Sequence, residues 1–246
     1  MYSDAHVHLD SYPAAERDDV IQRAHALGVE LMVTVGTTLD TCEQAVALAE
    51  HVPDLYAGVG IHPWWVVPWS DELEARLRDL ARRPRVKVVS EVGLDYTRGP
   101  TTQPQQRELL RHQIALAREL RLPVMTHNDR PSQEDLLALL REEGAADVGG
   151  VIHGFRGDWP FARGCLDLGF VISLGRLILR PEGAEQLEVL RRLPRDGLVL
   201  ETDSARQGPG PAEVALVAQR VGDVLDLPPE QVGNFTTANL KRVLRV

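Results

Sequence analysis

The sequence predicts an α/β protein folded as a single (β/α)₈ TIM barrel. Short strand-like runs alternate with longer amphipathic stretches along the chain of 246 residues, which indicates parallel strands joined by helices. Eight such units are the number that closes a barrel, and the length is typical of that fold. A doubly wound open sheet gives the same alternation and is the alternative fold.

The expected strands are short apolar runs bounded by polar or turn-forming residues. They cover residues 2–8, 29–35, 54–60, 86–91, 123–127, 148–153, 170–174 and 198–202. The helices between them carry apolar side chains at helical spacing. They are expected over Ala15–Leu27, Leu39–Glu50, Asp71–Arg82, Gln105–Leu120, Ser132–Glu142, Trp159–Leu168, Glu182–Leu193 and Pro211–Leu225.

A terminal helix is expected over Glu230–Val246, after the helix-breaking pair Pro228–Pro229, as a short cap on the barrel. No linker or low-complexity tract interrupts the pattern. Residues 1–246 are therefore expected to form one domain.

Composition limits the classes of function. The formal net charge of -9 argues against broad charge-driven binding to a nucleic-acid backbone, although bound metal ions can supply local positive charge. Cys42 and Cys165 lie far apart and are expected to be reduced structural thiols. No apolar run reaches membrane-spanning length, and the first residues read directly as a strand, so no signal peptide is expected. We therefore expect a cytoplasmic protein without membrane association or an obligate protein partner.

The first strand carries polar residues where a barrel strand is expected to be apolar. Within DAHVHLD at 4–10, alternation puts Asp4, His6, His8 and Asp10 on one face and the apolar residues on the other. Two imidazoles at this spacing can share one metal ion. An isolated pair is more often a polar strand end, so the pair alone does not establish a metal site.

Four further apolar runs stop at or near a histidine or carboxylate: Glu91, His127, His153 and Asp203. Because the C-terminal ends of all strands in a barrel meet in one ring, these side chains are expected to converge with His6 and His8. Together the six residues predict a metal site, and a carboxylate among them can bridge two ions about 3.5–4 Å apart.

The ordered motifs of the chain resemble the TatD family of metal-dependent hydrolases, the TatD-type deoxyribonucleases among the amidohydrolase-like barrels. They are DAHVHLD at 4–10, GVGIHPWWV at 58–66, EVGLDY at 91–96, Gln106 and Gln113 followed by ALARELRLPV at 115–124, HGF at 153–155, ETD at 201–203 and NFTTANLKRVL at 234–244. The resemblance covers nearly the whole chain and implies a TIM barrel whose activity centres on DNA hydrolysis.

Carried over position by position, the resemblance implies two divalent cations bridged by Glu91. His6 and His8 would complete one set of ligands, and His127 and His153 the other. Zn²⁺, Mn²⁺ and Mg²⁺ all suit such ligands.

The resemblance also implies that Asp203 binds a metal or its water, so Asp203 and Glu91 are the expected catalytic residues. A helix N-cap is the alternative role for Asp203. His62 and Asp95 are expected to contact the substrate.

The expected reaction is hydrolysis of DNA ends or single strands by a metal-activated water, with DNA or a nucleotide as substrate. A hydrolase of another bond (an amide, a lactone or a small phosphate ester) is the alternative. A non-catalytic barrel is ranked last because all six expected ligands are present.

Three departures from the family pattern each place an arginine shortly after an expected ligand. They are Arg130, Arg156 and Arg206. Arginine binds phosphate or carboxylate oxygens in pairs, so at least one is expected to clamp an anionic substrate group. Nearly every basic residue in this chain is arginine, so exposed arginines without such a role are the alternative.

Trp64, Trp65 and Trp69 lie beside Pro63 and Pro68 after the third strand. Such aromatic side chains can stack the bases of a single strand. Packing of the loop is the interpretation that the neighbouring prolines favour.

Overall fold

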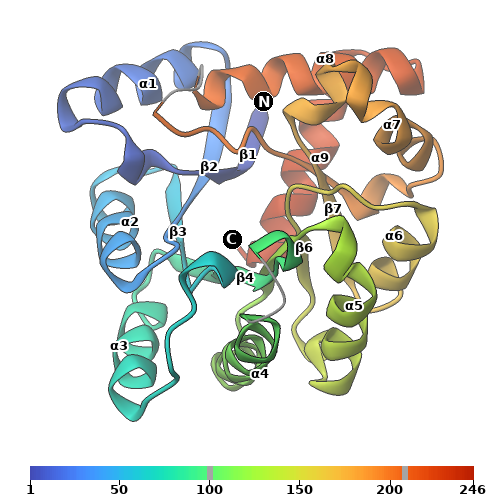
Figure 1. The fold of residues 1–246 in the computed structure, drawn as a ribbon. Helices are drawn as coiled ribbons and strands as arrows, with labels where there is room; N and C mark the ends of the chain where they lie inside the picture. Colours follow the sequence, from blue (N-terminus) through green and yellow to red (C-terminus); the bar gives the residue numbers. More distant parts are fainter. Residues whose placement is uncertain (99–101, 207–209) are drawn as a thin grey trace.

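The computed structural model describes residues 1–98, 102–206 and 210–246 (Figure 1). Within these ranges eight parallel strands form one sheet whose spatial order is the order of the chain. A doubly wound sheet would instead place the first strand in the interior of the order, so that alternative is wrong. The predicted TIM barrel is confirmed, and helices surround the strands on the outside (Figure 1).

The strands are close to those predicted. They are Tyr2–Val7 (β1), Val29–Val35 (β2), Leu55–Val59 (β3), Val86–Leu94 (β4), Val124–Asn128 (β5), Gly150–Ile152 (β6), Phe170–Leu174 (β7) and Leu198–Leu200 (β8).

The helices in the described ranges also follow the predicted order. They are Ala14–Ala26 (α1), Leu39–His51 (α2), Asp71–Ala81 (α3), Gln103–Leu120 (α4), Gln133–Glu142 (α5), Trp159–Leu166 (α6), Ala184–Leu190 (α7), Val214–Leu225 (α8) and Pro229–Leu244 (α9). None of the described helices combines the length and the apolar character needed to cross a membrane.

Polar residues fix the start of several helices at the mouth of the barrel. The side chains of Thr38, Ser70 and Asp158 each accept a hydrogen bond from a first-turn amide of α2, α3 and α6. Such caps satisfy amides that have no partner within the helix. They therefore hold the loops that lead from the strands into these helices.

The fourth strand extends further than predicted. It was expected to stop at Glu91, but pairing with β5 continues to Leu94. Gly93 permits this, because it has a φ of 143° and a Cβ there would lie 2.1 Å from the carbonyl oxygen of His127. The missing side chain lets the end of β4 lie directly against β5.

The barrel interior and the helix layer form two separate apolar clusters. The inner cluster combines Ala5, Leu31, Val33, Val35, Val88, Met125, Val151, Val171 and Val199 with Leu240 and Leu244 of α9. A larger cluster lies between strands and surrounding helices. The interior of the barrel is therefore a packed core and not an open pore.

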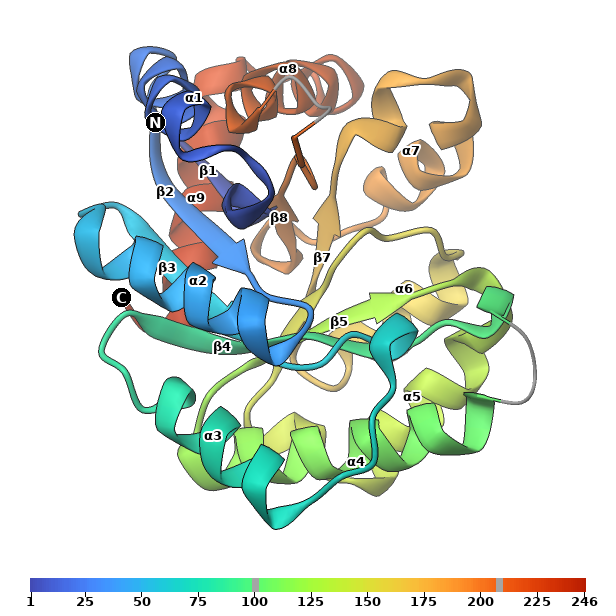
Figure 2. The same ribbon diagram turned by 60° about the vertical axis from the view of Figure 1, so that its left-hand side comes forward.

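The terminal helix α9 closes the N-terminal end of the barrel, as the predicted cap requires. Asn239 Nδ2 donates to the carbonyl oxygens of Arg195 and Leu198, each at 2.7 Å, where β8 begins. A Cβ on Gly233 would lie 2.4 Å from the carbonyl oxygen of Met1, so α9 also packs tightly beside the start of β1 (Figure 2). The opposite, C-terminal end stays available for a site.

The first strand departs from the simple alternation that the sequence predicts. Its register is irregular between Asp4 and Val7, so Ala5 packs inside the barrel and Val7 in the outer cluster. Asp4 does not join His6 at the mouth, because its carboxylate accepts from the amide and hydroxyl of Thr202 at 2.9 and 2.5 Å.

Both cysteines are buried free thiols. This agrees with the prediction of reduced structural residues. Burial raises the pKa of each thiol to about 12.

Candidate metal centre

A cavity of about 380 Å³ opens at the C-terminal ends of the strands. Among its lining residues are five of the six expected metal ligands, and the sixth, His6, is fully buried beside them. The lining consists of His8, Asp10, Ser11, Thr37, His62, Trp64, Trp65, Glu91, His127, Asn128, His153, Gly154, Arg156, Asp203 and Ala205.

Glu91, on β4, directs one carboxylate oxygen to the histidines of the first strand. Its Oε2 atom lies 3.3 Å from Nε2 of His6 and 3.5 Å from Nε2 of His8. The same two nitrogens lie 4.0 and 3.6 Å from Oδ1 of Asp203. These four side chains form one group of converging donors.

The other carboxylate oxygen of Glu91 faces three further imidazoles. Its Oε1 atom lies 3.3 Å from Nε2 of His153, 3.4 Å from Nδ1 of His127 and 3.5 Å from Nε2 of His62. His62, expected to contact substrate, thus lies as close to Glu91 as the expected ligands do. Glu91 is shared between two groups of nitrogen donors.

The donor atoms fit divalent cations. Three sets lie within 4.8 Å of one another: His6–His8–Asp203, His6–Glu91–His153 and His62–Glu91–His127. Imidazole with carboxylate suits first-row metals, and the carboxylates also admit Mg²⁺ or Mn²⁺. The ring of His153 stacks on that of His6 with centroids 3.4 Å apart. His153 thus lies with His6 in one set of donors, and His127 lies with His62 in another. The assignment of His153 and His127 to one shared ion stays a prediction.

Both acidic groups of the centre are ionised at neutral pH. Burial raises the pKa of Glu91, but the surrounding imidazoles, His6 first, outweigh burial and hold it well below its usual value. For Asp203, desolvation likewise raises the pKa, and the imidazole of His8 contributes most to lowering it below the normal range. Ionised carboxylates are the form that binds a cation.

The imidazoles divide into two kinds. Burial lowers the pKa of His6 and His62, which favours neutral rings that can ligate a metal. Burial also lowers the pKa of His8, but Asp203 and Glu91 outweigh burial and raise it to about 9. In the absence of a metal, His8 therefore carries a proton at neutral pH.

Glu201, which directly follows β8, contacts the edge of the His153 ring opposite to the one that faces Glu91. Its Oε2 atom lies 2.8 Å from Nδ1 of His153 and accepts from the Ser173 hydroxyl at 2.6 Å, while Oε1 accepts from the Gly154 amide at 2.7 Å. Burial opposes protonation of His153, but the negative charge of Glu201 raises its pKa well above normal. Glu201 has no role among the sequence-predicted site residues, although the ETD motif contains it.

Asp95 contacts the ring nitrogen of His127 that does not face Glu91. Its Oδ2 atom lies 3.0 Å from Nε2 of His127 and accepts from the indole nitrogen of Trp64 at 2.7 Å. The carboxylate also accepts from the amide and hydroxyl of Thr97. Asp95 is only 3 % exposed, so the structure surrounds this expected substrate contact with protein groups.

Asp203 occupies a strained position that joins the two ends of the sheet. Its φ is 52°, and its amide donates to the carbonyl oxygen of His6 at 3.0 Å. One residue later, Ser204 pairs with Val7 and accepts from the amide of His8. In the described ranges the next helical turn starts at Pro211, with Gly210 before it, so the N-cap alternative for Asp203 is wrong.

The three arginines differ in their positions. Arg156 is exposed and lines the cavity. Arg130 forms an ion pair with Glu185 at the start of α7. Arg206 is exposed beside Ser11, whose hydroxyl accepts from its backbone amide at 3.0 Å. Among the three, Arg156 is the one on the cavity lining, and the clamp itself stays a prediction.

Comparisons with known proteins agree with this arrangement. The family model described as TatD related DNase matches residues 3–245. A metal-dependent hydrolase of Bacillus subtilis, YabD, named as uncharacterized, is 33% identical over 255 residues, covering 100% of each chain. A protein of Klebsiella pneumoniae named 3'-5' ssDNA/RNA exonuclease TatD is 36% identical over 190 residues, covering 77% of this chain and 72% of that one.

A solved structure has the same architecture. The crystal structure of YJJV, a TatD homolog from Escherichia coli, matches with a TM-score of 0.90 at 29% identity. The match covers 100% of this chain and 98% of the other.

Proposed function

Because this chain belongs to the TatD family of metal-dependent hydrolases, we propose that it hydrolyses phosphodiester bonds in DNA, at ends or in single strands. The observation that carries the proposal is the position of Glu91, whose two carboxylate oxygens face separate groups of imidazoles. A carboxylate shared in this way suits a pair of ions, and paired ions favour in-line displacement at phosphorus.

His6, His8 and Asp203 would hold a cation on one side of Glu91, with His127, His153 and His62 available on the other. When bound, divalent cations supply positive charge for the phosphate oxygens and lower the pKa of water. Asp203, ionised and with 54% of its side chain exposed, would accept the proton of the attacking water. Glu201 keeps the ring of His153 in place during this step.

Two observations bear on the class of substrate: the name of one relative and the net charge of this protein. The Klebsiella pneumoniae relative is named as an exonuclease of single-stranded DNA and RNA. The net charge of -9 disfavours long electrostatic contacts with a duplex, so recognition must be local to the cavity. A single strand or a strand end satisfies that condition.

A hydrolysis screen tests the proposal. The parent protein and Glu91→Gln would be given labelled single-stranded DNA, blunt duplex DNA, a simple phosphodiester and a lactone, each with Mg²⁺, Mn²⁺ or Zn²⁺. We expect metal-dependent cleavage of the single strand by the parent and almost none by the variant. Hydrolysis of the lactone with no cleavage of any phosphodiester would overturn the proposed nuclease activity.

A further inference from the structure

The three tryptophans after β3 have different surroundings. Trp69 stacks on His112 with ring centroids 4.8 Å apart, and its indole nitrogen donates to Glu74 at 3.0 Å. Loop packing therefore accounts for Trp69. Trp64 and Trp65 are 44% and 53% exposed, so packing leaves much of each indole facing solvent.

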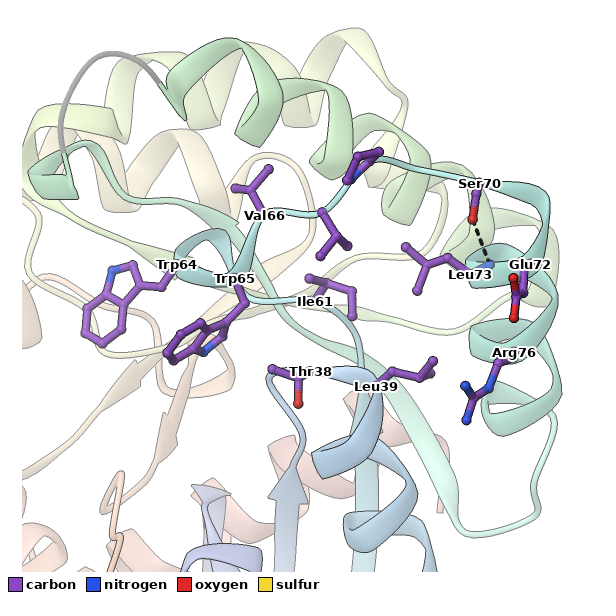
Figure 3. A pocket seen from close by; sticks show the side chains of 12 residues that line it. Thr38, Leu39, Ile61, Trp64, Trp65, Val66, Ser70, Glu72, Leu73 and Arg76 are labelled. Atoms are coloured by element: carbon purple, nitrogen blue, oxygen red, sulfur yellow. Dashed lines mark hydrogen bonds between the residues drawn. The ribbon is translucent and has the colours of Figure 1, made fainter.

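The two exposed indoles stand at one end of an apolar groove of about 630 Å³, here called the tryptophan groove. In Figure 3, Trp64 and Trp65 lie at the left end of the groove, next to the barrel mouth, and Ile61 and Leu73 lie along its middle. Ser70 and Arg76 lie at the right end, which is called the far end below. Thr38 and Leu39, at the start of α2, form the side opposite Val66 (Figure 3). The groove therefore runs from the barrel mouth between α2 and α3.

The tryptophan groove is continuous with the metal centre. Trp64 and Trp65 line both the groove and the cavity that contains Glu91. The indole of Trp64 is held at this junction, because it donates to Asp95 at 2.7 Å and forms a T-shaped contact with the His62 ring, with ring centroids 4.9 Å apart. A group attached to the reacting bond could therefore enter the groove directly.

We propose that the tryptophan groove binds an unpaired nucleobase next to the scissile phosphodiester, with the base stacked on Trp65. This inference rests on the proposed function and narrows the substrate to single-stranded nucleic acid. Stacking on an indole accepts any base, because every base has a π-face.

The order of side chains along the groove matches this occupant. The donors for metal ions lie on one side of the two indoles and the aliphatic wall on the other. A nucleotide has the same order, with a charged phosphate joined to a planar ring. The guanidinium of Arg76 at the far end is already paired with Glu43, so the groove itself offers little to bind a phosphate.

A duplex would bind less well than a single strand. A paired base is stacked between its neighbours, and it must be unpaired and unstacked, at a cost in free energy, before it can enter a groove. The base-binding groove therefore selects single strands and frayed ends without a basic surface.

Equilibrium binding to the metal-free protein tests this inference separately from catalysis. The probes are a fluorescein-labelled oligothymidylate and the same strand with abasic residues, each titrated in chelator and followed by anisotropy. The variants are Trp65→Ala and Trp65→Phe. The control is Leu216→Ala, which removes an apolar side chain that is 54% exposed on α8, away from the groove.

We expect the parent and Leu216→Ala to bind the base-containing strand about 5- to 100-fold more tightly than the abasic strand. Trp65→Ala should lose this preference and Trp65→Phe should keep most of it. Where the strand is hydrolysed, Trp65→Ala should raise KM for it and leave kcat near that of the parent.

The outcomes separate the two proposals. A parent protein that binds bases but cleaves no phosphodiester keeps the groove assignment and overturns the nuclease activity. A parent that cleaves DNA but binds both strands equally, or a Trp65→Ala variant that keeps the preference, overturns the groove assignment.

Discussion

Nδ1 of His153 lies 2.8 Å from Oε2 of Glu201, while Nε2 of the same ring faces Glu91 at 3.3 Å. The two carboxylates therefore hold opposite edges of one imidazole. A carboxylate behind a ligating histidine fixes the orientation of its ring and increases its basicity. We therefore expect Glu201 to position His153 for metal binding.

Glu201→Gln should lower the affinity for divalent cations about 10- to 100-fold, because an amide orients His153 without the negative charge. Calorimetric titration of the metal-free variant with Mn²⁺ measures this. Glu188→Gln is the matched control, since its side chain is 74% exposed on α7. Equal affinity in the parent and Glu201→Gln would show that Glu201 serves packing alone.

Asp203→Asn should reduce kcat on single-stranded DNA about 10²- to 10⁴-fold, because the amide cannot accept the proton of the attacking water. Asparagine tolerates the left-handed backbone at this position, where φ is 52°. The circular dichroism spectrum and Tm should therefore match those of the parent. A variant with near-parental rates would exclude Asp203 as the base.

Metal binding at pH 7.5 should release at least about one proton per protein molecule. His8, whose pKa is raised to about 9, is protonated in the metal-free protein and must lose that proton to ligate. Affinity should therefore rise with pH up to about 9. Calorimetry in two buffers with different ionisation heats counts the protons.

The same pKa shift predicts how the stability of the metal-free protein depends on pH. The folded-state pKa of His8 exceeds the ordinary value of 6.5, so its contribution is complete below pH 6.5 and is lost as the pH rises through about 9. Denaturant unfolding at several pH values measures the loss. His8→Gln should show a smaller loss and a smaller proton release than the parent, because His127 and His153 also have raised pKa values. If the variant behaves as the parent does, another group is responsible.

Arg156→Ala should lower kcat/KM for an anionic substrate by roughly 10-fold or more, the usual worth of a charge-assisted hydrogen bond. Arg156 lines the cavity, whereas Arg130 is paired with Glu185. Arg130→Ala therefore serves as the control. Arg206→Ala tests whether the third arginine, in the loop after β8, contributes to binding of the anionic group. A neutral ester should be hydrolysed equally by all three variants. If Arg156→Ala has the same kinetics as the parent on an anionic substrate, Arg156 does not bind an anionic group of the substrate.

Cys42 and Cys165 should resist thiol reagents in the native protein. Burial raises the pKa of each from 9.0 to about 12, so at pH 8 only about one thiol in 10,000 is ionised. A disulfide reagent should label both after unfolding, and Leu216→Cys should add a site that reacts at once. Fast labelling of the native parent would show that one of these thiols is accessible.

The site residues on the strands were predictable because a barrel brings the C-terminal parts of all its strands to a common ring. This rule places Glu91, His127 and His153 together from the sequence alone, even though β4 continues past Glu91 to Leu94. It works for β-strands because their direction and pairing follow from the alternation of elements.

Loop residues were harder to predict. The proximity of His62 to Glu91, and the enclosure of Asp95 by His127 and Trp64, depend on how the loops after β3 and β4 fold back over the mouth. No periodicity encodes that path. The irregular register of β1, which separates Asp4 from His6, is equally invisible in an alternating sequence.

Leu240 and Leu244 of α9 belong to the same apolar cluster as Ala5 of β1. A chain leaving the ribosome makes β1 first and α9 more than 200 residues later. During synthesis the interior side chains of the barrel therefore remain uncovered at one end until α9 emerges. Apolar surface that is exposed in this way is prone to aggregation until the last helix covers it.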